Sequence, residues 1–243
     1  MDLEGRFKSK KILMKKLLLI VTNVNQYASG LATGLWLSEL THIYHAAKEK
    51  GWAVTIASPK GGDVPIDPES LKPLVLDTIT RNYHEDPLFM KELNSSKSLN
   101  EVKNENFDCI YLAGGHATMY DFPDDVTLQV IIKNQYEKSK MVAAICHGVG
   151  GLLNVKLSNG EYLIKGKSIT GFDWFEETIA RRKREVPFNL EAAIKERGAN
   201  LKKAFIPMTS NVVVYNNLVT GQNPFSSKEM AKVVVKELVK TQK

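Results

Sequence analysis

The sequence predicts an α/β fold in which a doubly wound, mostly parallel sheet carries helices on both faces. Short, unbroken apolar runs alternate with amphipathic helical segments along the 243 residues. Continuous hydrophobicity is typical of strands that are covered on both faces, and alternation of strand and helix places a parallel sheet between two helical layers. Near the C-terminus two more apolar runs flank Asn216-Asn217, a tight-turn signal that predicts a hairpin added to the sheet.

The individual elements follow from these patterns in chain order. Strands are expected at 17–21, 53–57, 107–112, 141–145 and 168–170, with the hairpin at 212–214 and 218–220. Helices are expected at 34–50, 124–138, 147–154, 174–184 and 226–240. The stretch 59–106 is less regular and predicts a small cap insertion with a helix around 86–93. Such insertions often border active sites.

Length and composition indicate one globular unit. We expect a single domain over residues 14–243, preceded by a disordered basic extension at 1–13. The hydrophobic content of 43% and charged content of 25% are ordinary globular values, which argues against disorder and collagen-like structure. No apolar run approaches the ~18 residues of a membrane span. The run after Lys15-Lys16 ends without a cleavage pattern, so neither a signal peptide nor a membrane partner is expected.

The charge and the cysteine content limit which partners and which cellular compartment we expect. Much of the net charge of +6 lies in residues 1–16 and in the run 181–184. No nucleic-acid-binding motif accompanies these runs, so they indicate a solvated surface and no specific nucleic acid. The two cysteines, Cys109 and Cys146, are too few for a disulfide scaffold. A reducing compartment, and hence a cytoplasmic location, is expected.

Cys146 carries the clearest chemical signal in the sequence. The apolar run 141–145 leads directly into Cys146-His147-Gly148, with Gly150 and Gly151 close behind. This layout of strand, nucleophile and small residues before a helix is typical of a nucleophile elbow. The small residues permit the sharp turn, and the N-terminus of the following helix favours the thiolate. A buried core cysteine is the alternative, but the glycines favour a nucleophile.

Gly114, Gly115 and His116 form a second candidate group, directly after the run 107–112. Glycines at the carboxyl end of a strand let the backbone approach a ligand, and their N–H groups can face a developing oxyanion. We therefore expect these three residues at the oxyanion or substrate site. The alternative is a plain tight turn.

Glu39 is the third candidate, because it falls within an apolar helical stripe. On a helical wheel it lies among residues such as Leu40 and Ile43, whereas Ser38 and Thr41 lie on the opposite face. A carboxylate buried there is costly, so its pKa rises or hydrogen bonds hold it. A purely structural hydrogen bond to a neighbouring loop is the alternative.

Histidine positions limit the mechanism. No histidine follows His147, which excludes the later histidine that a class I glutamine amidotransferase requires. His147 and His116 are therefore the candidates to assist Cys146. No His/Cys/Asp cluster has convincing ligand spacing, and phosphate-binding glycine motifs are absent, so neither a metal nor a cofactor is expected.

Together these residues resemble the ThiJ/PfpI superfamily, which has a class I glutamine amidotransferase-like fold, and specifically its branch of heat-shock chaperone-like glyoxalase III proteins. The matching blocks are Thr33–Glu39, Gly51–Val54, Ser58–Pro68, Ala113–Pro123, Ala144–Gly148, Val186–Glu191 and Val219–Pro224. They span about residues 15–238. One departure is Ala117, where a glycine usually follows the histidine.

The resemblance implies a flavodoxin-like sandwich, a homodimer and site roles for particular residues. Cys146 would be the nucleophile, His147 its general acid or base, and Glu39 the buried carboxylate beside the thiol. The backbone N–H groups of Gly115 and His147 would form the oxyanion site. Asp173, Glu176 and Glu177 are alternative orienting carboxylates, although burial on the wheel favours Glu39.

The implied activity is a stress-related, glutathione-independent glyoxalase III, a lyase that converts methylglyoxal or related 2-oxoaldehydes to 2-hydroxy acids. A small-molecule aldehyde is then the substrate. One alternative is a redox-responsive chaperone with an oxidisable Cys146 and unfolded-protein clients. A cysteine peptidase or deglycase that uses the same nucleophile is a further alternative.

Overall fold

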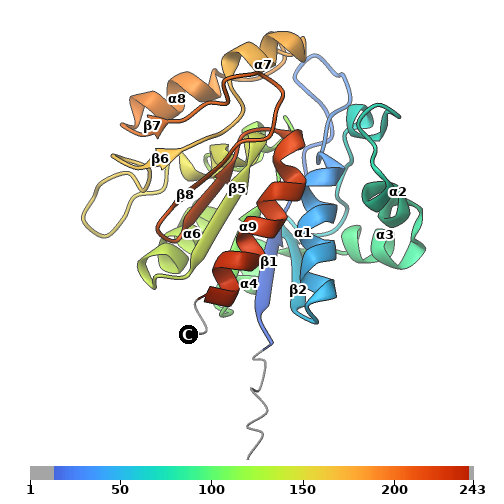
Figure 1. Cartoon of the computed structure of the whole chain (residues 1–243), viewed down its shortest axis with the longest axis horizontal. Helices are drawn as coiled ribbons and strands as arrows, with labels where there is room; N and C mark the ends of the chain where they lie inside the picture. The colour runs from blue at the N-terminus through green and yellow to red at the C-terminus, as the bar shows by residue number, and fades with distance from the viewer. Residues whose placement is uncertain (1–13, 241–243) are drawn as a thin grey trace, which may run out of the picture.

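A seven-stranded sheet forms the centre of the protein, whose structure is a computed structural model that describes residues 14–240 (Figure 1). The strand order is β3-β2-β1-β4-β5-β9-β8, and only β8 runs antiparallel to its neighbour. The strands are β1 (Lys16–Ile20), β2 (Ala53–Ser58), β3 (Lys97–Ser98), β4 (Cys109–Leu112), β5 (Met141–Ile145), β8 (Val212–Tyr215) and β9 (Leu218–Gly221). The predicted parallel sheet and C-terminal hairpin are confirmed, and the expected extension at 1–13 lies outside the described residues.

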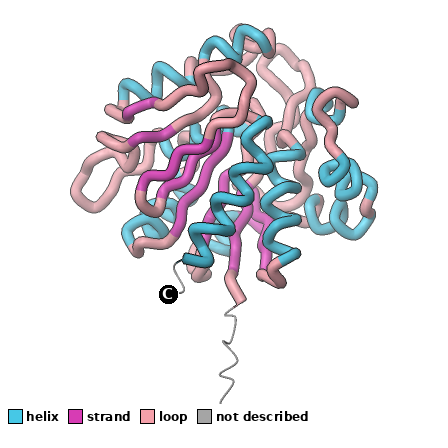
Figure 2. The backbone as a smooth tube through the Cα atoms, in the orientation of Figure 1, coloured by secondary structure: helices cyan, strands magenta, loops and turns pink. Residues whose placement is uncertain are grey.

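Helices cover both faces of this sheet (Figures 1 and 2). In the view of Figure 1, α1 (Leu37–Glu49) and α9 (Ser227–Lys240) lie side by side in front of the strands, and α6 (Val126–Glu137) lies behind them with α4 (Leu99–Val102). The apolar residues 17–20 of β1 are all fully buried. A strand that is covered on both faces needs apolar side chains at every position. The unbroken apolar run that predicted β1 therefore also explains its burial between two layers of helices.

The cap insertion is confirmed and is larger than expected. It contains η1 (Pro68–Leu71), α2 (Thr78–Glu85) and α3 (Pro87–Leu93). Helix α2 packs on the flank of α1, where Thr41 Oγ1 lies 3.0 Å from Thr80 Oγ1. Ser38 and Thr41 are therefore buried rather than solvated, which corrects the polar face expected for α1. The wheel could not show that a second helix covers that face.

Three expected elements differ in detail. The segment after Cys146 is a 3₁₀ helix, η2 (Cys146–Leu152), rather than an α-helix. The run at 168–170 forms β6 (Ser168–Ile169), which pairs with β7 (Asn200–Leu201) in a separate two-stranded sheet. The helix expected at 174–184 is the shorter α7 (Trp174–Ile179). The elements α5 (Thr118–Asp121), α8 (Leu190–Glu196) and η3 (Pro224–Ser226) complete the fold.

The sheet brings the candidate residues to one edge. Strands β4 and β5 are neighbours, with Leu112 opposite Ala144, so the residues that follow them emerge together. The N-terminus of α1 joins them there, because the Trp36 N–H donates to the Gly114 carbonyl over 3.0 Å. Within residues 14–240 no helix has the length and apolarity needed to cross a membrane.

Candidate active site

Cys146 occupies a sharp turn at the carboxyl end of β5. Its φ of 57° lies in the left-handed region, which a non-glycine residue adopts only when its surroundings enforce it. The turn packs tightly against β4, since a Cβ on Gly148 would lie 2.7 Å from the Leu112 carbonyl oxygen. The thiol is almost fully buried, and its Sγ lies 3.3 Å from His147 Nδ1. The strand and glycine pattern therefore builds the predicted elbow.

A buried carboxylate, Glu177, joins two histidines behind the thiol. His147 Nε2 lies 2.9 Å from Glu177 Oε2, and His116 Nε2 lies 3.0 Å from Glu177 Oε1. All three residues are at most 5% exposed. Burial alone would raise the pKa of Glu177, but the charges and N–H donors of the two histidines hold it well below its usual range. The carboxylate is therefore ionised and accepts one N–H from each ring.

This arrangement fixes which nitrogen of His147 carries the proton. Because Nε2–H donates to Glu177, the neutral form of the ring would have its free lone pair on Nδ1, the atom that faces Cys146. By the same reasoning the Nδ1 of His116 is an acceptor, and within residues 14–240 it has no hydrogen-bond partner. Burial and the neighbouring charge of His147 lower the pKa of His116. Cys146, His147 and Glu177 thus form a continuous chain of contacts from the thiol through the imidazole to the carboxylate.

Glu39 lies on the other side of the thiol and is fully buried, as the helical wheel predicts. Its Oε2 accepts the Gly114 N–H over 2.8 Å. A Cβ on Gly114 would lie 2.5 Å from that oxygen and 2.9 Å from the Cβ of Cys146, so only glycine fits between them. Burial raises the pKa of Glu39 to about 8, although the bonds from Cys146 and the Gly114 amide oppose the rise. The carboxyl therefore keeps its proton at neutral pH.

The protonation of Glu39 matters for the thiol. Burial raises the pKa of Cys146 well above its usual value, and a negative charge on Glu39 would raise it further. The backbone N–H of His147 acts in the opposite direction. A neutral Glu39 removes the repulsion and can donate its proton in a hydrogen bond. The His147 N–H takes the place of the α-helix N-terminus expected from the sequence, because the segment that follows Cys146 is the 3₁₀ helix η2.

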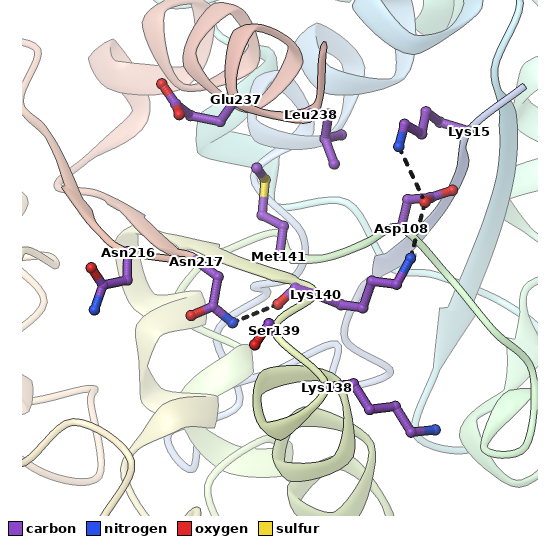
Figure 3. A pocket seen from close by; sticks show the side chains of 10 residues that line it. All are labelled: Lys15, Asp108, Lys138, Ser139, Lys140, Met141, Asn216, Asn217, Glu237 and Leu238. Atoms are coloured by element: carbon purple, nitrogen blue, oxygen red, sulfur yellow. Dashed lines mark hydrogen bonds and ion pairs between the residues drawn. The ribbon is translucent and has the colours of Figure 1, made fainter. Parts of the chain in front are cut away.

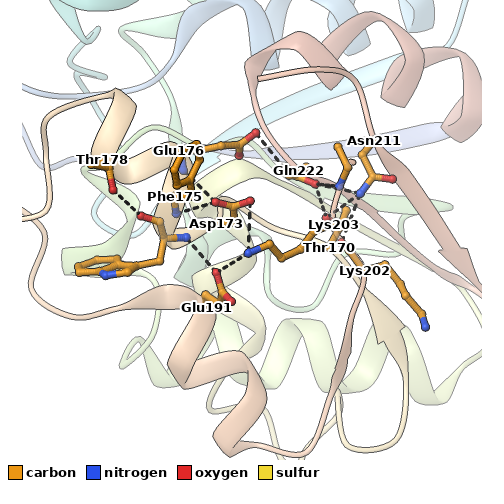
Figure 4. A network of polar contacts seen from close by, with 12 residues as sticks. Thr170, Asp173, Phe175, Glu176, Thr178, Glu191, Lys202, Lys203, Asn211 and Gln222 are labelled. Atoms are coloured by element: carbon orange, nitrogen blue, oxygen red, sulfur yellow. Dashed lines mark hydrogen bonds and ion pairs between the residues drawn. The ribbon is translucent and has the colours of Figure 1, made fainter. Parts of the chain in front are cut away.

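A buried polar network fixes α7, the helix that carries Glu177 (Figure 4). Asp173 caps it by accepting the N–H groups of Phe175 and Glu176. Glu176 Oε1 accepts three further donors, which are Met208 N–H, Gln222 Nε2 and Asn223 Nδ2. Because Glu176 is held from that side, its neighbour Glu177 projects toward the histidines.

A small cavity of about 70 Å³ opens at Cys146. Its walls are mainly apolar, and in the part of the chain that the structure describes no lysine or arginine lines it. The lining residues are Trp36, Val75, His116, Cys146, His147, Phe172, Ala180, Met208, Pro224 and Phe225. The space suits a small, uncharged substrate placed directly against the thiol.

The structure brings together the residues that the sequence singled out, with different contacts for some of them. Cys146, His147 and Glu39 lie side by side. The Gly114 amide is already bonded to Glu39, which leaves the neighbouring Gly115 amide as the donor for a substrate oxygen. His116 lines the cavity, but its Nε2 is bonded to Glu177.

Glu177 was only an alternative in the sequence, one of three acidic residues in a short segment. The sequence indicated Glu177 only weakly, as a carboxylate in the first turn of a helix that follows the apolar Phe172. The ligand atoms of His116, His147 and Glu177 lie within 4.8 Å of one another, so this group could hold a metal ion. Sequence spacing gave no sign of that group, because its members lie far apart in the chain.

Comparison with known proteins shows which family and fold the chain is similar to. The DJ-1/PfpI family matches residues 30–237. The chain is 32% identical over 230 residues to a glutathione-independent glyoxalase of Saccharomyces cerevisiae, covering 89% of this chain and 95% of that protein. The crystal structure of glyoxalase III from Candida albicans has a TM-score of 0.83 at 28% identity, covering 92% of this chain and 97% of that one. The Rapid Encystment Protein 24 kDa of Francisella tularensis has a TM-score of 0.88 at 37% identity, covering 93% and 99%.

Proposed function

The chain belongs to the DJ-1/PfpI family, and we propose that it is a glutathione-independent glyoxalase that converts methylglyoxal or a related 2-oxoaldehyde to a 2-hydroxy acid. Relatives at about 30% identity over most of the chain carry the name glutathione-independent glyoxalase. The observation that carries the proposal for this chain is the ordered contact of Cys146 Sγ with His147 Nδ1, and of His147 Nε2 with Glu177. A thiol, a base and an orienting carboxylate are the parts that covalent aldehyde chemistry requires.

The first step forms a carbon–sulfur bond. His147 Nδ1 takes the thiol proton as Sγ attacks the aldehyde carbon C1, and the product is a hemithioacetal. The oxygen that gains charge on C1 accepts hydrogen bonds from the Gly115 and His147 backbone N–H groups. Neutral Glu39 supplies a proton donor beside the sulfur, so the charge that develops there does not face a second anion.

The second stage moves a proton between adjacent carbons. A base removes the proton from C1 while the oxygen on C2 gains a proton, which gives an enediol. A proton is then delivered to C2 as the hydroxyl on C1 loses its own, which yields a thioester with a hydroxyl on C2. We assign this transfer to His147, with Glu39 as the second proton carrier. Water then attacks the thioester, releases the 2-hydroxy acid and restores the thiol. C1 is oxidised as C2 is reduced, so the balance needs water alone and no external electron acceptor.

Lactate production from methylglyoxal in the absence of glutathione tests the proposal. Wild type is expected to turn over, and Cys146→Ala is expected to reduce the rate to the uncatalysed level. Cys109→Ala is the matched control, because Cys109 is also a buried free cysteine but begins β4 at the opposite edge of the sheet. Turnover that survives Cys146→Ala, or a folded wild type without turnover, would contradict the proposal.

We further propose that the protein is one domain over residues 14–243 and acts as a cytoplasmic homodimer. Both cysteines are free and buried, which agrees with a reducing compartment. Light scattering after gel filtration should give twice the chain mass of 27.2 kDa. Unfolded-protein clients remain a prediction. The test is whether the Cys146→Ala variant still prevents the aggregation of a denatured client protein. If it does, the chaperone activity does not depend on catalysis.

A further inference from the structure

A second hollow lies beside the catalytic cavity. This groove, of about 480 Å³, lies between the start of α1, the segment 74–79 and the segment 224–228 that leads into α9. Helix α1 lies between α2 and α9 in Figure 1. Four residues line both hollows: Trp36, Val75, Pro224 and Phe225. The boundary between groove and cavity is therefore made of these side chains.

That boundary can open at low cost. The Phe225 side chain is 48% exposed although it faces both hollows, and Val75 is only half-buried. Exposed side chains change rotamer on the picosecond to nanosecond timescale. The path from the cavity to the groove would therefore run past the Phe225 side chain.

The groove walls combine apolar and polar surface, and the polar part includes Ser38, Thr78, Ser227 and Lys228. Val75, Leu76 and Ile79 contribute aliphatic surface from one segment, and Phe225 adds an aromatic ring from another. Two of the polar residues in the groove already bond to each other, since His42 Nε2 lies 2.8 Å from Asp77 Oδ2. A hydrocarbon chain laid against these walls would be removed from water without leaving that pair unsatisfied.

We propose that the enzyme accepts 2-oxoaldehydes whose ketone carbon carries an extended apolar substituent. The two carbonyl groups occupy the cavity of about 70 Å³ at Cys146, and the substituent passes Phe225 into the groove. This inference rests on the proposed glyoxalase function and names the substrate class of that same site. The bonds made and broken are those described above, because the substituent on C2 takes no part in them.

A homologous series of substrates tests the inference. We expect kcat/KM to rise from methylglyoxal through n-propylglyoxal to n-pentylglyoxal, since each fully buried methylene contributes a factor of about four. A rise of at least about tenfold across the series is expected. It should appear mainly as a lower KM, because binding that is equal in the ground and transition states leaves kcat unchanged.

Variants of the groove locate the effect. Leu76→Asn and Ile79→Asn add polarity to residues that line the groove and not the catalytic cavity. We expect each to lower the ratio of pentylglyoxal to methylglyoxal kcat/KM by about fivefold or more. Leu88→Asn is the matched control, because Leu88 is an exposed residue of α3 that lines neither hollow. Circular dichroism and thermal unfolding verify that each variant folds.

The outcomes separate this inference from the proposed function. If methylglyoxal is turned over but kcat/KM stays constant or falls as the substrate chain lengthens, the inference is wrong and the glyoxalase function stands. The inference is also wrong if Leu88→Asn changes the ratio of pentylglyoxal to methylglyoxal kcat/KM as much as Leu76→Asn does. Absence of turnover with every substrate would instead contradict the proposed function itself.

Discussion

Two carboxylates at opposite edges of the sheet each have two basic partners, but the partners and the surroundings of the two differ. At the amino ends of the strands, Asp108 Oδ1 lies 3.4 Å from Lys15 Nζ and 3.3 Å from Lys140 Nζ, in a hollow of about 640 Å³ (Figure 3). At the carboxyl ends, Glu177 accepts from His116 and His147 beside a cavity of about 70 Å³. The larger hollow holds partly exposed ion pairs, and the smaller one holds the Cys146 thiol.

Burial and the type of base account for the difference. A lysine ammonium group donates hydrogen bonds and has no lone pair that could accept a proton, so the Asp108 pairs supply charge and hydrogen bonds but no base. Histidines have a second nitrogen that can accept a proton, and at the buried edge Glu177 decides which nitrogen that is. The volume of a hollow is therefore a poor guide to chemistry in this molecule, whereas convergent, desolvated acid and base groups are a good one.

The largest effect should come from Glu177→Gln. A glutamine amide has one acceptor oxygen, so it cannot accept N–H bonds from both histidines, and the tautomer of His147 is no longer fixed. We expect kcat for methylglyoxal to fall by about 10²–10⁴. The rate of Cys146 alkylation by iodoacetamide across pH should change shape as well, because the base that accepts the thiol proton is altered.

Glu196→Gln provides the control for that substitution. Glu196 undergoes the same chemical change on α8, and its side chain is 80% exposed. It should leave turnover and alkylation as in wild type. If Glu177→Gln retains wild-type kcat, the chain of thiol, base and carboxylate is not the catalytic unit, and the contrast between the two edges fails.

The contrast also shows how far the sequence predicts the site. The burial of Glu39 and the turn at Cys146 depend on neighbours within a few residues, so periodicity and glycines predict them. Glu177 lies 30 residues beyond His147, beside the equally acidic Glu176. Only contacts that Glu176 makes with residues beyond 200 decide which of the two faces the histidines, and no local pattern encodes those contacts. The groove beside the cavity is likewise formed by three distant segments.

Glu39→Gln should separate activity from stability at the catalytic edge. The pKa of Glu39 is about 8 in the folded protein against 4.5 for a solvated carboxyl, so between these values the folded state holds a proton that the unfolded state has lost. The free energy of unfolding therefore falls as pH rises through this window, by up to about 4 kcal/mol between pH 5 and pH 8. Glutamine does not ionise, so the Glu39→Gln variant avoids this loss of stability. Its turnover should drop, because glutamine cannot carry a proton.

Urea unfolding of wild type and Glu39→Gln at pH 5 and at pH 8 measures the effect. The variant should gain stability relative to wild type at pH 8 and much less at pH 5, with turnover reduced at both. An equal difference at the two pH values would mean that Glu39 does not hold a proton in the folded state, and its assignment as a proton carrier would then be wrong.

The smallest effect should come from Asp108→Asn at the open edge. Burial alone would raise the pKa of Asp108, but the Lys16 N–H and the two lysines lower it, so its stabilising contribution is present at neutral pH and is lost as pH falls through the lowered pKa. Partly exposed ion pairs contribute about 0.2–1 kcal/mol each, and asparagine can still accept the Lys16 N–H. We expect a loss of about 0.4–2 kcal/mol at neutral pH that shrinks in high salt and in acid, with kcat for methylglyoxal unchanged. A fall in kcat would show that the two edges are coupled through β4, since that strand joins Asp108 to Gly114 beside the thiol.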